Sequence, residues 1–158
     1  MKIGHVSLGT AASGRDDRFF DSVKALSDVD INQHVLVSNV VLARRLAELK
    51  GVSVGPIVKT PVMAYCLMPN VDLAHIHELQ SGQAGLLLTL TRSIPFVLTT
   101  GSENEATLNP LTRSVLHRAI KIIPRDDESS ARELANAYLM SYEEAVNTWY
   151  RAALKIQS

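Results

Sequence analysis

Two histidines and a glutamate stand at the end of a short apolar run in the middle of this 158-residue chain. The run, residues 71–78, reads Val-Asp-Leu-Ala-His-Ile-His-Glu and has turn residues on both sides, Pro69-Asn70 before it and Ser81-Gly82 after it. Such a run is typical of a strand buried on both faces, and we place it at the centre of a parallel sheet. Ligands of open α/β sheets bind beyond the carboxyl ends of the strands. We therefore expect chemistry at His77, the candidate catalytic residue, and at Glu78.

His75 and His77 are two residues apart, so their side chains lie on the same face of the predicted strand. We expect His77 at the exposed end, where an imidazole beside Glu78 can exchange a hydrogen bond or a proton with a ligand hydroxyl near neutral pH. A histidine satisfied within the fold is the alternative. As a zinc pair the two would need a third ligand, and no motif in the sequence supplies one, so we predict no metal site. His5 and His34, on other predicted strands, are expected to be structural.

A glycine-containing loop, residues 9–14, is expected at the same edge of the sheet. Gly9, Gly14 and the following Arg15 have the spacing of a phosphate-binding loop, but the Lys-Ser/Thr pair that reaches phosphate and magnesium is missing. We therefore exclude an NTPase. No G-x-G-x-x-G follows the first strand, so we also expect no dinucleotide, and no cofactor is predicted. The loop could still approach an anion or a sugar hydroxyl through these three residues, or serve structure alone.

A further predicted strand, residues 95–100, ends at the same edge in Thr100, Gly101 and Ser102. Their hydroxyls and backbone turn would lie close to a ligand crevice, and we count them with Glu78 among the candidate binding residues. Such residues are also common in loops that bind nothing. The sequence contains no nucleophile elbow, no H-E-x-x-H motif and no pair of carboxylates at catalytic spacing.

The composition indicates one globular domain. Hydrophobic residues make up 46% of the chain and charged residues 20%, a balance that argues against disorder. The 16 basic and 16 acidic residues cancel, so no broad field favours nucleic acid or an anionic membrane. The single cysteine, Cys66, excludes a disulfide framework; we expect it to pack in the core of a cytoplasmic protein. The sequence shows neither a signal peptide nor an apolar run near the roughly 20 residues that span a bilayer.

Strands alternate with helices along the chain. The expected strands are residues 3–8, 34–38, 52–58, 71–78, 95–100 and 119–123. This alternation predicts right-handed βαβ units in one α/β domain with a doubly wound, mainly parallel sheet and helices on both faces. Gly55-Pro56 places the third strand at an edge. The last segment, residues 141–156, has an apolar stripe that includes Trp149, and we expect it to dock on the body with the indole largely buried.

Four short motifs resemble the N-terminal, Rossmann-like domain of GT-B glycosyltransferases, the retaining family-four enzymes in particular. They are Lys-Ile-Gly-His-Val at residues 2–6, Asp-Leu-Ala-His-Ile-His-Glu at 72–78, Ile-Pro-Phe-Val-Leu-Thr at 94–99 and Arg-Ala-Ile-Lys-Ile-Ile at 118–123. The resemblance implies a Rossmann-like domain over residues 1–138 and a crossover-type helix over 139–158. In that family the histidine at the position of His77 lines the acceptor side of the cleft and contacts the transferred sugar.

The chain departs from that family because it has no second Rossmann domain to hold the nucleotide-sugar. It also lacks the adjacent glycine pair in residues 9–14. The resemblance therefore implies an acceptor-side domain for hexosyl transfer in glycan synthesis, inactive alone and acting with a donor-binding partner chain, or a degenerate homologue. A non-enzymatic sugar- or nucleotide-binding or assembly module is the alternative, and a flavodoxin-like carrier is a third. We expect a sugar acceptor or a homo-oligomer partner, and neither nucleic acid nor an integral membrane segment.

Overall fold

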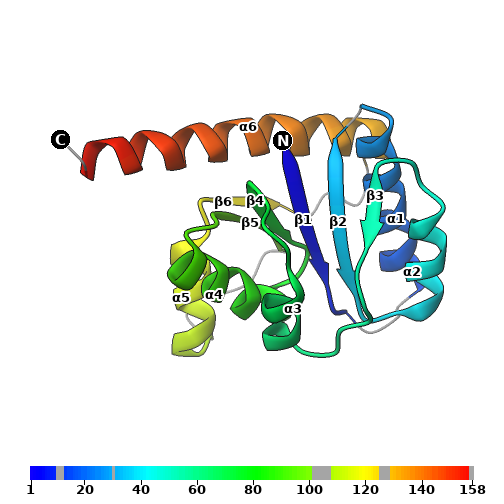
Figure 1. Cartoon of the computed structure of the whole chain (residues 1–158), viewed down its shortest axis with the longest axis horizontal. Helices are drawn as coiled ribbons and strands as arrows, with labels where there is room; N and C mark the ends of the chain where they lie inside the picture. Colours follow the sequence, from blue (N-terminus) through cyan, green and yellow to red (C-terminus); the bar gives the residue numbers. More distant parts are fainter. Residues whose placement is uncertain (10–12, 30, 101–107, 125–128, 157–158) are drawn as a thin grey trace.

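The computed structural model describes residues 1–9, 13–29, 31–100, 108–124 and 129–156. One six-stranded sheet organises them, with the order β3-β2-β1-β4-β5-β6 and parallel pairing throughout (Figure 1). The strands are β1 (Lys2–Ser7), β2 (Asn32–Val37), β3 (Val52–Val54), β4 (Leu73–Ile76), β5 (Phe96–Thr100) and β6 (Lys121–Pro124). This is the strand order of a Rossmann fold. The predicted doubly wound parallel sheet is confirmed, as is the edge position of the third strand.

Helices cover both faces of the sheet (Figure 1). On one face lie α1 (Ser13–Ser27), α2 (Val40–Ala47) and α6 (Ala131–Ile156), and on the other α3 (Pro61–Leu67), α4 (Gly82–Arg92) and α5 (Pro110–Arg118), with a short 3-10 turn, η1 (Leu79–Ser81), before α4. Alternate residues of each strand point to opposite faces of the sheet. In β1, Ile3 packs with α1 and α6, whereas Val6 packs with α3 and α4.

Polar side chains mark where several helices begin. Asn39 accepts a backbone N–H at the start of α2, as do Thr60 at α3 and Asn109 at α5. At α6 the Ser130 N–H donates to the Glu133 carboxylate at 2.9 Å, and the Glu133 N–H donates to the Ser130 hydroxyl at 3.4 Å. This reciprocal pair is a capping box, which satisfies backbone donors that the first helical turn leaves without partners. It fixes the start of α6 at Ala131, close to the acidic stretch of residues 126–129, where we expect a helix to begin before Leu134 and Tyr138.

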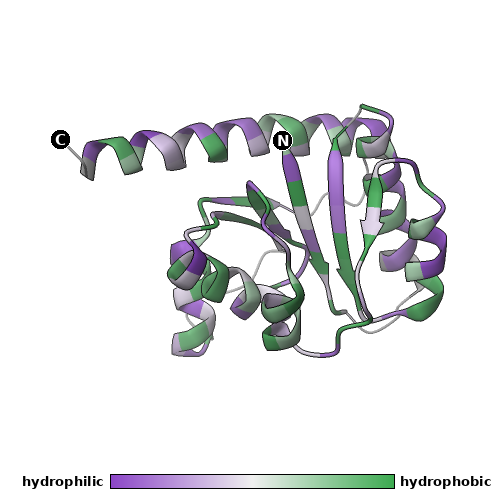
Figure 2. Ribbon diagram, in the orientation of Figure 1, coloured by the Kyte–Doolittle hydropathy of each residue, from purple (hydrophilic) through white to green (hydrophobic). Residues whose placement is uncertain are grey.

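The last helix is one continuous element, so the division at residue 138 falls inside α6. The helix docks on the body as predicted, with Tyr138, Tyr142 and Ala145 buried against the sheet and α1. Trp149, by contrast, is half-buried and Tyr150 is exposed, so the expectation of a largely buried indole is wrong. The reason is that α6 extends past the sheet at its C-terminal end (Figure 1). Hydrophobic residues nevertheless recur along its whole length (Figure 2).

Cys66 is exposed on α3 and does not pack in the core, because that helix turns Ala64 toward the sheet instead. Among the helices that the structure describes, none has the length and apolar character needed to cross a membrane.

Candidate functional site at the centre of the sheet

Three buried histidines lie side by side on the face of the sheet that α1 and α6 cover. His5 on β1 and His75 on β4 are register partners and fully buried, and His77, directly after β4, is 9% exposed. The ring centroids of His75 and His77 are 3.7 Å apart, and those of His5 and His77 are 5.3 Å apart. The two-residue period of the strands puts all three on one face. The pairing of β1 with β4 therefore supplies the third histidine that no sequence motif indicated.

His75 is held by hydroxyl groups on both sides of its ring. Its Nδ1 lies 2.6 Å from the hydroxyl of Tyr142 on α6, and its Nε2 lies 2.7 Å from the hydroxyl of Thr99 on β5. Burial, reinforced by the proximity of His5, lowers the pKa of His75 well below its usual value. Burial also raises the pKa of Tyr142 well above its usual value, with a smaller contribution from Tyr138. A neutral imidazole has one donor and one acceptor nitrogen, so one hydroxyl accepts from His75 and the other donates to it.

His5 completes the cluster. Its Nδ1 is 3.0 Å from Nε2 of His77, so the two rings share a hydrogen bond. Burial lowers the pKa of His5 to about 3, and the neighbouring Gln33 side chain offsets this only in part. On the other side of the ring, Nε2 of His5 and the amide oxygen of Gln33 lack a well-formed hydrogen bond to any described residue. Buried polar atoms are nearly always hydrogen-bonded. These two atoms can therefore each form one more hydrogen bond.

Aromatic side chains close the cluster off from solvent. Phe19 of α1 meets the His77 ring edge-on at 4.5 Å, and Tyr138 of α6 meets the His75 ring edge-on at 4.7 Å between centroids. The expectation that His77 stands at an exposed strand end is therefore wrong, because α1 and α6 cover that end of β4.

Glu78 clamps the ends of the two central strands together. Its carboxylate accepts hydrogen bonds from the backbone N–H of Leu8, from the hydroxyl of Ser7 at 3.2 Å and from the hydroxyl of Ser81. In a Rossmann fold, donors at this switch point are the ones that bind an anionic ligand. Here a side chain of the protein uses them. These donors of Ser7, Leu8 and Ser81 are therefore already engaged within the protein.

Two other predicted binding residues lie at the same edge without joining the cluster. Gly9 follows β1, and its carbonyl accepts a hydrogen bond from the Ser38 hydroxyl at 3.3 Å. Thr100 ends β5 and is buried. Its neighbour Thr99 is the residue that reaches His75, because alternate residues of β5 face opposite sides of the sheet.

The remaining predicted residues are only partly described. Gly14 and Arg15 belong to the first turn of α1, and the structure does not describe the side chain of Arg15. Gly101 and Ser102 lie outside the described residues.

Sequence reasoning placed the hydroxyls at the end of β5 near the site, but it took His5 as structural and missed Tyr142. A signal for His5 was present: it occupies an inward position of the first strand, and in a 3-2-1-4-5-6 sheet the first and fourth strands are neighbours. No such signal existed for Tyr142, because the sequence does not show where a helix crosses the sheet.

Comparisons with known proteins contradict the resemblance to glycosyltransferases. No family model and no curated protein matches the chain. A solved structure that does match is that of AnUbiX (PadA1) in complex with FMN and dimethylallyl pyrophosphate, with 9% sequence identity and a TM-score of 0.47 over 92% of this chain and 91% of that chain. That neighbour is not a GT-B glycosyltransferase. The assignment to that family is therefore wrong, as is the glycosyltransferase function in glycan synthesis that it implied.

At this level of similarity, nothing about the ligands of AnUbiX is carried over to the present chain. The alternative of a sugar- or nucleotide-binding module gains no support from the comparisons either. Self-association remains a prediction.

Proposed function

We propose that this protein binds a divalent transition-metal ion, with Zn²⁺ as the first candidate, through His5, His75 and His77. The observation that carries the proposal is the proximity of the three imidazoles: one nitrogen from each lies within 4.8 Å of the other two. Zn–N bonds of about 2.0–2.1 Å in a tetrahedral site place nitrogen ligands about 3.3 Å apart. The His5 and His77 nitrogens are already 3.0 Å apart. To complete the ligand set, His75 would have to give up its hydrogen bond to Tyr142 or to Thr99 and turn that nitrogen toward the other two.

The protonation of the cluster supports this assignment. Metal ligation requires neutral imidazole, and burial keeps the pKa of His5 at about 3 and that of His75 well below its usual value. Both rings are therefore neutral at pH 7. Ligation would require Nδ1 of His5 and Nε2 of His77 to be free of protons, so the nitrogen that donates in their hydrogen bond would pass its proton to the other nitrogen of its own ring. A water molecule, or a hydroxyl that now bonds His75, would supply the fourth ligand.

The surroundings contain the outer groups that metal-binding histidines use. Such a histidine almost always donates its other ring N–H to an acceptor, which fixes the ring and its tautomer. The amide oxygen of Gln33 is suited to accept from Nε2 of His5, since both atoms lack a well-formed hydrogen bond. The hydroxyls of Thr99 and Tyr142 flank His75 in the same way. Because Phe19 and Tyr138 enclose the rings, the ion would tie β1 to β4 and would not meet a substrate.

Titration of metal-free protein with Co²⁺ and Zn²⁺ tests the proposal. After treatment with a chelator, the protein is expected to bind one Co²⁺ per chain with the visible absorption of a tetrahedral nitrogen site, and Zn²⁺ is expected to displace it. Zn²⁺ at 100 times its dissociation constant should raise the free energy of unfolding by about 2.7 kcal/mol.

The two other histidines of the chain provide matched controls. His117 is exposed and His34 lies outside the cluster, so His117→Gln and His34→Gln should bind metal as wild type does. His77→Gln should weaken binding by more than about 100-fold, because loss of an outer-shell partner alone costs about 10- to 100-fold. His5→Asn is the second ligand variant, and circular dichroism verifies that each variant is folded. The proposal would be refuted if the protein did not bind metal stoichiometrically, or if folded His77→Gln bound metal as tightly as wild type. The three histidines would then serve only as hydrogen-bonded core residues.

A further inference from the structure

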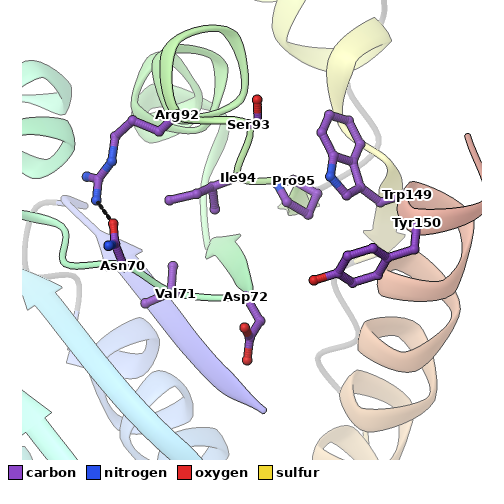
Figure 3. Close-up of a pocket in the computed structure, with 9 residues that line it drawn as sticks. All are labelled: Asn70, Val71, Asp72, Arg92, Ser93, Ile94, Pro95, Trp149 and Tyr150. Carbon is purple, nitrogen blue, oxygen red and sulfur yellow. Dashed lines mark hydrogen bonds between the residues drawn. The ribbon is translucent and has the colours of Figure 1, made fainter. Parts of the chain in front are cut away.

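A cavity lies at the opposite edge of the sheet from the histidines, where β4 and β5 begin. Its volume is about 360 Å³, which falls in the range of small-molecule sites. Residues 70–72, residues 92–95 and residues 149–150 of α6 form its walls (Figure 3). None of these residues belongs to the histidine cluster, so the cavity is a separate feature.

Two aromatic side chains form the α6 wall. Trp149 is half-buried and Tyr150 is 59% exposed, and both line the cavity. In Figure 3 their rings stand on α6 opposite residues 70–72, with Pro95 beside the indole. The faces of Trp and Tyr rings carry negative electrostatic potential and attract cations.

A carboxylate stands across the cavity from these rings. Asp72 is exposed, and one of its oxygens accepts the backbone N–H of Lys2 at 2.7 Å. The guanidinium that also lines the cavity, that of Arg92, donates to the carbonyl of Met68 at 2.6 Å and to the amide oxygen of Asn70 at 2.8 Å. Figure 3 shows it turned toward Asn70, away from the rings. The half of the cavity next to α6 therefore combines two aromatic rings with a negative charge.

We propose that this half of the cavity binds a small organic cation of the quaternary ammonium class. The rings of Trp149 and Tyr150 would contact its methyl groups, and Asp72 would supply the opposite charge. A primary ammonium has three N–H donors that need acceptors, and beside the Asp72 carboxylate the aromatic wall offers the Tyr150 hydroxyl alone. A quaternary ammonium needs no hydrogen bonds, so one carboxylate and two aromatic rings meet its requirements.

The tryptophan provides the readout, since Trp149 is the single tryptophan of the chain. Choline is the probe, and 3,3-dimethylbutan-1-ol, which has the same shape without the charge, is the control ligand. Choline at constant ionic strength is expected to change the Trp149 emission in a saturable way. It should bind at least about tenfold more tightly than the neutral alcohol, as two ring faces and a carboxylate would give.

Substitutions of Asp72 and Tyr150 test whether these residues bind choline. Asp72→Asn, which can still accept the Lys2 N–H, should weaken choline binding about tenfold, whereas Asp21→Asn, an exposed change on α1, should leave it unaltered. Tyr150→Ala should weaken binding to a similar extent, and Tyr150→Phe should preserve it because the ring remains. Tyr150 is exposed, so these variants are expected to fold.

Three results would overturn the proposal: an emission change that does not saturate, equal affinity for choline and the neutral alcohol, or wild-type affinity in both Asp72→Asn and Tyr150→Ala. Equal affinity would indicate an apolar hollow without charge recognition. None of these outcomes depends on metal binding by the histidine cluster, so the two proposals fail separately.

Discussion

Replacement of Tyr142 by alanine should remove a large part of the stability of this fold. The side chain is fully buried between the sheet and α1, and truncation of a buried aromatic residue costs about 3–5 kcal/mol. The variant also loses the hydrogen bond from the hydroxyl to His75 and leaves a buried ring nitrogen without its partner, which costs about 1–3 kcal/mol more. The expected loss of about 4–8 kcal/mol is comparable to the whole stability of an ordinary domain, about 5–15 kcal/mol.

Tyr142→Phe separates the two contributions, because it keeps the ring and removes the hydroxyl. It should lower the free energy of unfolding by about 1–3 kcal/mol. Urea unfolding followed by circular dichroism measures both variants, with the loss read from the midpoint at an unchanged m-value. Trp149→Ala is the comparison on the same helix. Its indole is half-buried at the rim of a cavity, so we expect a loss near the average for point mutations, about 1 kcal/mol.

The reasoning is refuted if Trp149→Ala destabilises the protein as much as Tyr142→Ala does, since α6 would then dock mainly through its C-terminal half. A neutral Tyr142→Phe would refute the hydrogen-bond contribution alone.

Two further predictions concern pH and packing. Burial lowers the pKa of His5 to about 3, so between about pH 6.5 and 3 the unfolded chain takes up a proton that folded His5 does not, and the lowered pKa of His75 acts in the same direction. The free energy of unfolding of metal-free protein should therefore be highest above about pH 6.5 and fall below it by about 1.4 kcal/mol per pH unit through His5, with a further loss through His75; urea midpoints unchanged from pH 7 to 5 would contradict this. Gly85→Ala should destabilise the protein by about 1–3 kcal/mol in thermal unfolding, because its Cβ would lie 2.6 Å from the Phe96 ring, whereas Gly9→Ala, whose Cβ would meet no atom within 4 Å, should be neutral.

Most of the fold could be predicted because its signals are local. Short apolar runs bounded by Gly and Pro mark strands that are buried on both faces, and the helical spacing between them indicates crossovers. Gly55-Pro56 weakened the third strand, which is in fact short and at the edge. The start of α6 also has a local signal in the sequence, since Ser130 and Glu133 have the spacing of a capping box.

The candidate site could be predicted only in part because it depends on contacts between distant segments. His75 and His77 belong to one strand, so the period of that strand places them on one face. The positions of His5 and Tyr142 depend instead on which strands are neighbours and on where α6 crosses the sheet. Sequence spacing could not show that α1 and α6 cover the end of β4. The expected open site at His77 is therefore an enclosed one.

The polar contact between β4 and α6 also explains how a repetitive helix finds one position on the sheet. Tyr138 and Tyr142 are four residues apart on the same stripe, so a shift of α6 by one turn would put one tyrosine where the other lies and an aliphatic residue, Leu134 or Val146, in the second place. Apolar packing alone discriminates weakly between these positions. The hydroxyl of Tyr142 lies 2.6 Å from Nδ1 of His75, and a shifted helix would have to rebuild that bond with another residue. A shift that brought Val146 to the place of Tyr142 would leave this buried nitrogen without a partner, which costs more than a hydrogen bond gains, so His75 disfavours a shift in that direction. Metal binding would act on the same residue: an ion that draws His75 toward His5 and His77 competes for, or reorients, the group that sets the position of α6.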